Sequence, residues 1–332
     1  FAQGNRKGQK EDLKANRYAS RLGRTVDVML AIASALVLAV GAKLVINGQM
    51  SAGELLVFLA YLKQAFKPAQ NFAKYTARLA KGTAAGERVV DLLGQRSDIR
   101  DAPGAVEAPA FHGDLGLKEL SFSYQKNQPV LCKIDCHIPA GTSLAIVGPS
   151  GIGKSTLVSL VPRLYDPTDG AIIIDGRDIR EYTLSSLRRQ LGLVPQETIL
   201  FAASARENIA CGDEGLSDEA IEAAARLAGA DDFIRQLPNG YDTILGERGA
   251  TLSRGQRQRI SVARAAVRET PILVLDEPTT GLDDDSQRVV VAALERLSQG
   301  RTTILVTHDL QLARLMDRVI LLQEGRVAEG GS

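Results

Sequence analysis

The sequence predicts an α/β domain built on a mostly parallel sheet, preceded by an all-α transmembrane hairpin. From Leu115 onward, short β-branched runs alternate with helical patterns, which is typical of a mostly parallel sheet covered by helices. The runs are SLAIV, AIII, LGLV, PILVLD and TTILVT. Residues 94–114 are rich in Gly, Pro and Asp and are expected to form a linker. We therefore divide the chain into a membrane part at residues 1–93, the linker at 94–114 and the α/β domain at 115–332.

The N-terminal part predicts two membrane helices joined by the short turn NGQMSAG. The stretch Val28–Ala42 carries no charge, and the apolar segment at residues 26–46 is long enough to span a bilayer. A buried core helix is the alternative for this segment. A second helix is expected from Glu54 to about Leu93. Basic residues flank the hairpin on one side and are missing from its turn, so both ends are expected in the cytoplasm.

Overall composition gives little support to a nucleic-acid partner. Lys plus Arg number 40 and Asp plus Glu 39, a formal net charge of +1, and nucleic-acid binding usually needs a basic surface. Three cysteines without a CxxC pair suit a reduced compartment. The chain starts with Phe1 and stops after RVAEGGS without a terminating element, so we expect it to be a piece of a longer protein.

A phosphate-binding loop is predicted where SLAIVGPSGIGKST runs from an apolar strand into a helix. Gly148, Gly153, Lys154 and Ser155 occupy the fixed positions of GxxxxGK[ST]. The glycines let backbone N–H groups close around phosphate oxygens. Lys154 is expected to reach the outer phosphates and the Ser155 hydroxyl to ligate Mg²⁺. A glycine-rich turn without a ligand is the alternative.

Two further strands are predicted to end in polar groups. PILVLDE ends in Asp276 and Glu277, and TTILVTHD places His308 at the tip of its strand. Asp276 would hold Mg²⁺ and Glu277 would orient or deprotonate an attacking water. His308 would contact the terminal phosphate, because α/β folds bind ligands at the carboxyl ends of their strands. The alternatives are a solvated Asp-Glu turn and a histidine of the core or surface.

The stretch LSRGQRQR predicts the start of a helix, because Ser253 and Gln256 have the spacing of a capping box. Arg254 at the first helical position is disfavoured by the helix dipole, which favours an anion there. Tyr124 in LSFSY is either an exposed strand residue or a stacking platform for a base.

Taken in order, these motifs resemble the nucleotide-binding domain of an ATP-binding cassette (ABC) transporter. Residues 1–93 are similar to the last two membrane helices of an exporter-type subunit. The resemblance implies an α/β P-loop NTPase fold with a helical subdomain and an ATPase that uses ATP and Mg²⁺ to drive export. It also implies a second ABC subunit, as a homodimer or heterodimer, that completes the ATP sites. The subunit would lie in the plasma (inner) membrane, with its ATPase domain in the cytoplasm.

The resemblance also implies roles for individual residues. Gln196 in LVPQE matches the Q-loop, and GERG at residues 246–249 resembles a segment that exporters place near the opposing membrane helices. The expected catalytic groups are Glu277, His308 and Gln196, and the expected magnesium ligands are Ser155, Gln196 and Asp276. The residues expected to bind ATP are Tyr124, Gly148, Ser150, Gly151, Gly153, Lys154, Ser155, Thr156, Ser253, Gly255 and Gln256.

LSRGQ matches the signature motif LSGGQ, which in this family lies across a dimer interface. The anion expected at the start of this helix is then the terminal phosphate of ATP bound by the partner. Two departures concern the interface: Arg254 replaces a glycine, and Thr280-Gly281 stands where Ser-Ala is commoner. We expect the Arg254 side chain to point out of the phosphate contact.

Separate features of the sequence bear on two alternative functions and on the substrate class. A soluble ABC-class ATPase has no need of the apolar segment at residues 26–46. A non-hydrolysing partner of a heterodimer has no need of Glu277, His308 and Ser253 together. A basic stripe on the second helix, which spans an arc of roughly 60°, would favour an anionic substrate. A cytoplasmic extension of the helix, where lysines meet phospholipid headgroups or acidic neighbours, is the slightly favoured alternative. The stripe consists of Lys63, Lys67, Lys74, Arg78 and Lys81.

Overall fold

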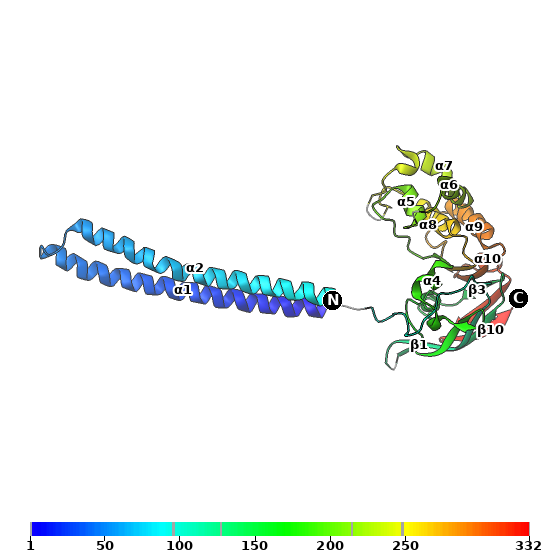
Figure 1. The fold of residues 1–332 in the computed structure, drawn as a ribbon, viewed down its shortest axis with the longest axis horizontal. Coiled ribbons are helices and arrows are strands. Elements are labelled where there is room, and N and C mark those ends of the chain that lie inside the picture. Colours follow the sequence, from blue (N-terminus) through cyan, green and yellow to red (C-terminus); the bar gives the residue numbers. More distant parts are fainter. Residues whose placement is uncertain (1, 95–96, 127, 214, 247–248, 332) are drawn as a thin grey trace. The chain divides into compact units, whose positions relative to one another are not determined.

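The computed structural model describes residues 2–94, 97–126, 128–213, 215–246 and 249–331. Side chains are not described at residues 2–23, 69–70, 73–74, 76–77, 80 and 329, so the Lys74 side chain lies outside the description. Residues 247–248 of the GERG segment also lie outside it. The chain divides into two compact units, Phe1–Ser97 and Asp98–Ser332, and each is described by itself (Figure 1).

The first unit is an antiparallel helical hairpin of α1 (Ala2–Ile46) and α2 (Ala52–Gly94) (Figure 1). Gly41 permits close approach of the two helices, because a Cβ there would overlap the Leu55 side chain. Among the described helices, one segment, Arg24–Ile46, is long and apolar enough to cross a membrane. Only 6 % of its most apolar window is buried, which is unlike a core helix. The apolar segment therefore fits a membrane span better than a packed core within this unit.

The second unit contains a six-stranded sheet in the order β10-β9-β3-β8-β7-β6. Every neighbouring pair is parallel except β10 and β9, so this sheet is mostly parallel, as predicted. The predicted runs SLAIV, LGLV, PILVLD and TTILVT all fall in it. Its strands are β3 (Ser143–Val147), β6 (Leu191–Val194), β7 (Ile272–Asp276), β8 (Thr302–Val306), β9 (Arg318–Gln323) and β10 (Arg326–Gly331).

A second, antiparallel sheet has the order β2-β1-β4-β5 and was not expected from the sequence. The run AIII was interpreted as part of the parallel sheet, and this is wrong, because it lies in β4 and pairs antiparallel with β1 and β5. The hairpin turn of Asp175 (φ 49°) and Gly176 (φ 85°) reverses the chain between β4 and β5. The strands are β1 (Leu115–Gln125), β2 (Gln128–Ile138), β4 (Asp169–Ile174) and β5 (Arg177–Asp178).

Two hydrophobic cores hold the second unit together. One joins both sheets to α3 (Lys154–Leu160) through buried residues such as Leu117, Ile146 and Leu157. The other lies in the helical part, in which α5, α6, α7 and α8 gather together (Figure 1). This arrangement confirms an α/β fold with a helical subdomain. The helices are α4 (Leu184–Arg189), α5 (Ala205–Ala210), α6 (Asp218–Leu227), α7 (Asp231–Arg235), α8 (Arg254–Val267), α9 (Asp284–Ser298) and α10 (Leu310–Ala313), with short 3₁₀ turns at Ile179–Glu181 and Gly240–Asp242.

Candidate functional site

The predicted phosphate loop joins β3 to α3 at the carboxyl end of the parallel sheet. Gly151 (φ 79°) and Gly153 (φ 106°) take left-handed conformations that side chains disfavour. A Cβ on Gly153 would also meet the Val130 carbonyl oxygen at 3.2 Å. The loop therefore needs glycine at both positions to keep its shape.

Lys154 begins α3 and is almost fully buried, at 5 % exposure. Its Nζ donates hydrogen bonds to the carbonyl oxygens of Gly148 (2.9 Å) and Pro149 (3.0 Å). The ammonium thus lies folded onto its own loop. Ser150 and Gly151, at the loop tip, are exposed.

Ser155 and Asp276 meet between α3 and the end of β7. The Ser155 hydroxyl donates to Asp276 Oδ1 at 3.1 Å. Burial raises the pKa of Asp276 above its ordinary value, and the neighbouring Glu277 charge adds to this; the Ser155 hydrogen bond and Lys154 oppose it. An oxygen ligand set with two adjacent, partly dehydrated carboxylates suits a hard divalent cation. The residues present therefore fit the implied Mg²⁺.

Glu277 occupies the centre of the cluster. It adopts a left-handed conformation (φ 44°), which is unusual for a residue with a side chain, and its amide donates to Val306 O at 2.8 Å. Its Oε2 accepts hydrogen bonds from Gln196 Nε2 (2.9 Å) and Thr280 Oγ1 (3.0 Å). Backbone strain and two side-chain donors together fix the carboxylate.

Two cationic or titratable groups complete the surroundings of Glu277. His308 Nδ1 lies 3.6 Å from its Oε2, and Lys154 Nζ lies 4.0 Å from its Oε1. The Glu277 side chain is 14 % exposed and that of His308 60 %. The structure thus brings together Glu277, His308, Gln196 and Lys154 from four separate segments of the sequence.

The hydrogen bond of Gln196 differs from the contact expected of a magnesium ligand. Its amide nitrogen is hydrogen-bonded to Glu277, whereas Ser155 and Asp276 are bonded to each other. In this state Gln196 holds the carboxylate. Its role as a magnesium ligand stays a prediction.

Tyr124 lies near the end of β1, and its exposure is 54 %. Its hydroxyl lies 3.1 Å from Thr156 Oγ1 on α3. The rings of Phe122 and Tyr165 meet it nearly at right angles, at centroid distances of 4.8 and 5.4 Å. The ring is therefore fixed beside the phosphate loop while remaining accessible.

The helix predicted from LSRGQRQR begins where expected. Ser253 is the N-cap of α8, its Oγ accepts from Gln256 N (3.2 Å), and Gln256 Oε1 accepts from Ser253 N (2.9 Å). This confirms the capping box. Gly255 packs against α9, because a Cβ there would lie 2.6 Å from Ser286 Cβ.

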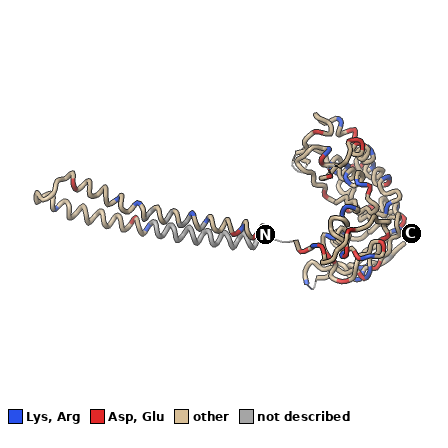
Figure 2. The backbone as a smooth tube through the Cα atoms, in the orientation of Figure 1, with Lys and Arg blue, Asp and Glu red and all other residues tan. Residues whose placement is uncertain are grey.

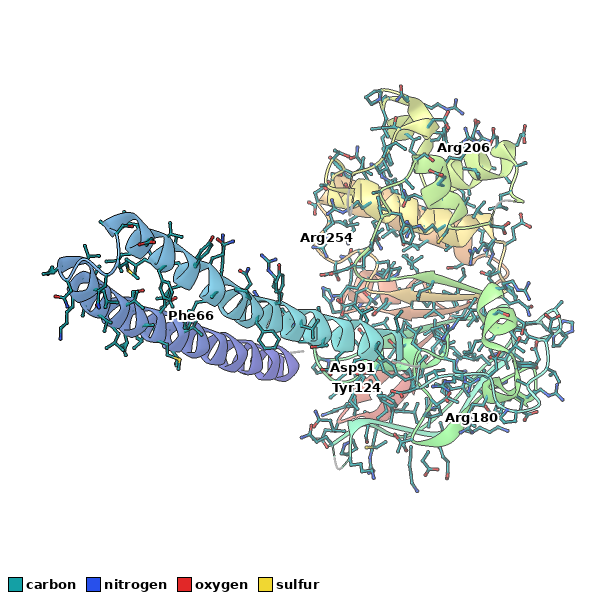
Figure 3. The ribbon with its side chains drawn as sticks, turned by 60° about the vertical axis from the view of Figure 1, so that its left-hand side comes forward. Phe66, Asp91, Tyr124, Arg180, Arg206 and Arg254 are labelled. Carbon is teal, nitrogen blue, oxygen red and sulfur yellow. The ribbon has the colours of Figure 1, made fainter. Side chains whose placement is uncertain are left out.

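The start of α8 is not joined to the phosphate loop within the chain. Among the described residues, the side-chain hydrogen bonds of Ser253 and Gln256 stay inside the capping box. Arg254 lies in the helical part, whereas Tyr124 lies on the sheet part (Figure 3). The expected ATP-binding residues therefore form two groups, residues 124–156 and residues 253–256.

Three contacts at the site were not predicted from the sequence: Tyr165 supports Tyr124, Thr280 binds Glu277, and Gly281 contacts Arg254. Tyr165 is an ordinary aromatic residue without a motif position that carries chemistry. Thr280 and Gly281 were noticed only as departures from a family pattern. No local sequence signal pointed to their contacts.

Comparison with known proteins matches residues 131–280 to the model of the ABC transporter family. The chain carries an ABC transporter domain. Over 320 residues it is 41 % identical to an ATP-dependent lipid A-core flippase of Desulfotalea psychrophila, covering 96 % of this chain and 56 % of that protein. A flippase of the same description from Syntrophus aciditrophicus is 45 % identical over 288 residues, covering 87 % of this chain and 48 % of that protein.

The ABC transporter domain and its hairpin also resemble a solved structure of a bacterial Atm1-family ABC exporter with ATP bound. The TM-score is 0.73 at 34 % identity, covering 96 % of this chain and 56 % of that one. This chain spans about half the length of the proteins that it matches. An ABC transporter domain implies ATP binding and, in general, ATPase activity.

The buried Asp276 carboxylate predicts a pH-dependent stability. Because its pKa is raised in the folded state, its contribution to stability is complete below the ordinary pKa and is lost as pH rises through the raised one. Asp276→Asn should therefore raise the Tm of the nucleotide-free protein at pH 7, and the gain should shrink as pH falls toward 4. Thermal unfolding across this range measures it, with the exposed Asp98→Asn as control. A lower Tm for Asp276→Asn at pH 7 would contradict the argument.

Proposed function

We propose that this chain is the ATP-binding and ATP-hydrolysing part of an ABC exporter subunit. The observation that carries the proposal is the Glu277 carboxylate, held by Gln196 and Thr280 next to Lys154 and His308. A carboxylate fixed beside a phosphate loop is placed to orient and deprotonate an attacking water. Neighbouring Asp276 and Ser155 supply oxygen ligands for Mg²⁺.

Each group has a separate task in the proposed reaction. Tyr124 stacks on the adenine, and the loop at residues 148–153 surrounds the phosphates. Lys154 exchanges its bonds to the Gly148 and Pro149 carbonyls for bonds to the outer phosphates. Ser155 and Asp276 would hold Mg²⁺, which would neutralise charge on the phosphates. Glu277 takes a proton from the attacking water, and His308 donates to the terminal phosphate.

The second group of residues serves ATP bound by a partner subunit. The N-terminus of α8, with Ser253 and Gly255, is suited to an anion by its dipole and its N–H groups. Since the described contacts of Ser253 do not reach its own phosphate loop, we assign this anion to the nucleotide of a second ABC subunit. Closure of two such domains around two ATP molecules is a ligand-biased domain motion that can move attached membrane helices.

The hairpin supports an integral location in the plasma (inner) membrane, with the ATPase domain in the cytoplasm. Arg24–Ile46 fits a membrane span, which argues against a soluble ABC-class ATPase. Positive charges are interspersed with negative ones over the second unit, so no single-sign surface favours nucleic acid (Figure 2). The fixed Glu277 argues against a non-hydrolysing partner.

We propose an anionic substrate class on the basis of the basic stripe on α2. Lys63, Lys67, Arg78 and Lys81 are exposed in this unit. Charges at membrane depth are expected to face protein or a water-filled cavity rather than lipid. A stripe that lies outside the membrane and meets phospholipid headgroups is the alternative.

The test of the proposed function is ATP hydrolysis by the full chain in nanodiscs, compared with Ser253→Ala. We expect the wild type to hydrolyse ATP cooperatively and Ser253→Ala to abolish that hydrolysis while ATP affinity in dilute monomer stays nearly unchanged. Losing the cap costs about 1 kcal/mol of stability, so Ser217→Ala, which removes the N-cap of α6, is the matched control. Equal loss of ATP binding in dilute Ser253→Ala monomer would show that Ser253 acts on its own chain's nucleotide.

A further inference from the structure

Arg254 has no evident role in the proposed chemistry. It is exposed at the first position of α8, where the helix dipole disfavours a positive charge. Among the residues that the structure describes, no hydrogen bond or ion pair of the Arg254 side chain is found. Electrostatics within this unit therefore does not explain why an arginine stands there.

The guanidinium of Arg254 lies directly against Gly281, in the turn after Glu277. Gly281 has φ 70°, and a Cβ built on it would lie 2.9 Å from Arg254 Cζ and 3.4 Å from its Nε. A side chain at residue 281 would therefore displace the guanidinium, the far end of a flexible side chain, from this contact. Arg254 and Gly281 are also two places at which the sequence departs from the family pattern. The contact links the two departures, because the absence of a side chain at Gly281 leaves room for the Arg254 guanidinium.

Arg254 also shares a cavity with the loop that carries Gln196. Together they line a cavity of about 510 Å³, whose wall is formed by Gln196, Glu197, Thr198, Ile199, Arg254, Arg257 and Gln258. Arg254 thus lies between two segments. Each of them supplies one hydrogen bond to Glu277 Oε2, from Gln196 Nε2 and from Thr280 Oγ1.

We propose that Arg254 is a positioning residue, which supports the turn at residues 279–283 from the helical part of the same chain. By packing on Gly281 it keeps the adjacent Thr280, and through it the Glu277 carboxylate, in place for hydrolysis. Its side chain is directed at its own chain and is not a phosphate ligand. This inference rests on the proposed function, because it assigns the contact to the same reaction.

A double-mutant cycle in the full chain in nanodiscs tests the inference. The variants are Gly281→Ala, Arg254→Gly and the two combined, with kcat and KM for ATP measured separately. Gly300→Ala is the matched control, because Gly300 has φ 71° and open space around a built Cβ. It introduces the same backbone strain without a clash.

We expect Gly281→Ala to lower kcat about tenfold in the wild-type background and at most about threefold in the Arg254→Gly background, since contacting residues are energetically coupled. Arg254→Gly alone should lower kcat by about two- to threefold. KM should change by less than about twofold in every variant, because the phosphate contacts are untouched. Gly300→Ala should behave like the wild type.

Equal losses of kcat from Gly281→Ala in both backgrounds would overturn the inference, as would a large rise of KM in Arg254→Gly. The same double-mutant cycle, measured as Tm, tests the contact independently of ATP hydrolysis. Gly281→Ala should lower Tm more when Arg254 is present. Additive Tm changes overturn the inference even if the wild type proves to be inactive. An inactive wild type, or hydrolysis that survives Glu277→Gln, overturns the proposed function instead.

Discussion

Glu277→Gln is expected to abolish ATP turnover while ATP binding persists. A general base contributes about 10²–10⁴-fold to the rate, so kcat should fall by at least about a hundredfold. The amide oxygen of glutamine can still accept the hydrogen bonds from Gln196 and Thr280, which keeps the local structure. ATP that binds and is not hydrolysed should trap a stable dimer. Phosphate release measures the turnover, and light scattering with and without ATP measures the dimer.

Glu295→Gln serves as the control for Glu277→Gln, because Glu295 is an exposed residue of α9 away from the cluster. It removes one carboxylate charge in the same way and should hydrolyse ATP like the wild type. Turnover by Glu277→Gln near the wild-type rate would remove Glu277 from its assigned role.

Lys154→Ala is expected to act earlier, by weakening the binding of ATP itself. Hydrogen bonds to charged groups are worth about 1.5–3 kcal/mol, so the Kd for ATP should rise by about ten- to a hundredfold. Affinity for adenosine should stay unchanged, because this substitution does not alter the proposed base platform at Tyr124. Equilibrium binding of both ligands measures the difference.

The exposed Lys118→Ala on β1 is the control for the loss of a positive charge. It should bind ATP like the wild type. A parallel loss of adenosine and ATP affinity in Lys154→Ala would mean that the variant has lost its fold, and unchanged ATP affinity would contradict the assignment of Lys154.

Local patterns were enough to predict several elements and their ends. The strands that became β3, β7 and β8 are short apolar runs, and each is followed by the polar groups that the structure brings together. The capping box of Ser253 and Gln256 was readable because both partners lie within four residues. Short-range geometry of this kind can be predicted from the spacing of residue types along the sequence.

Direction and distant contacts could not be predicted in the same way. The run AIII has the β-branched composition of a parallel strand, but the Asp175-Gly176 turn makes it antiparallel. Pairs such as Thr280 with Glu277 and Tyr124 with Thr156 use common residue types, for which no pattern marks the partner. The contact of Arg254 with Gly281 depends on how two helices and a turn pack, and the spacing of residues along the chain does not specify this packing.

The central claim is that one subunit's phosphate loop works with the partner's Ser253, and mixing two inactive variants tests it most directly. Lys154→Ala and Ser253→Ala chains are each prepared alone, then mixed in equal amounts and reassembled. If Ser253 acts across the dimer, each mixed dimer contains one intact site, formed by Lys154 of one chain and Ser253 of the other. Random assembly then gives intact sites at about a quarter of the wild-type number. We predict that the mixture hydrolyses ATP well above either variant alone; a mixture no more active than its parts would contradict the composite site.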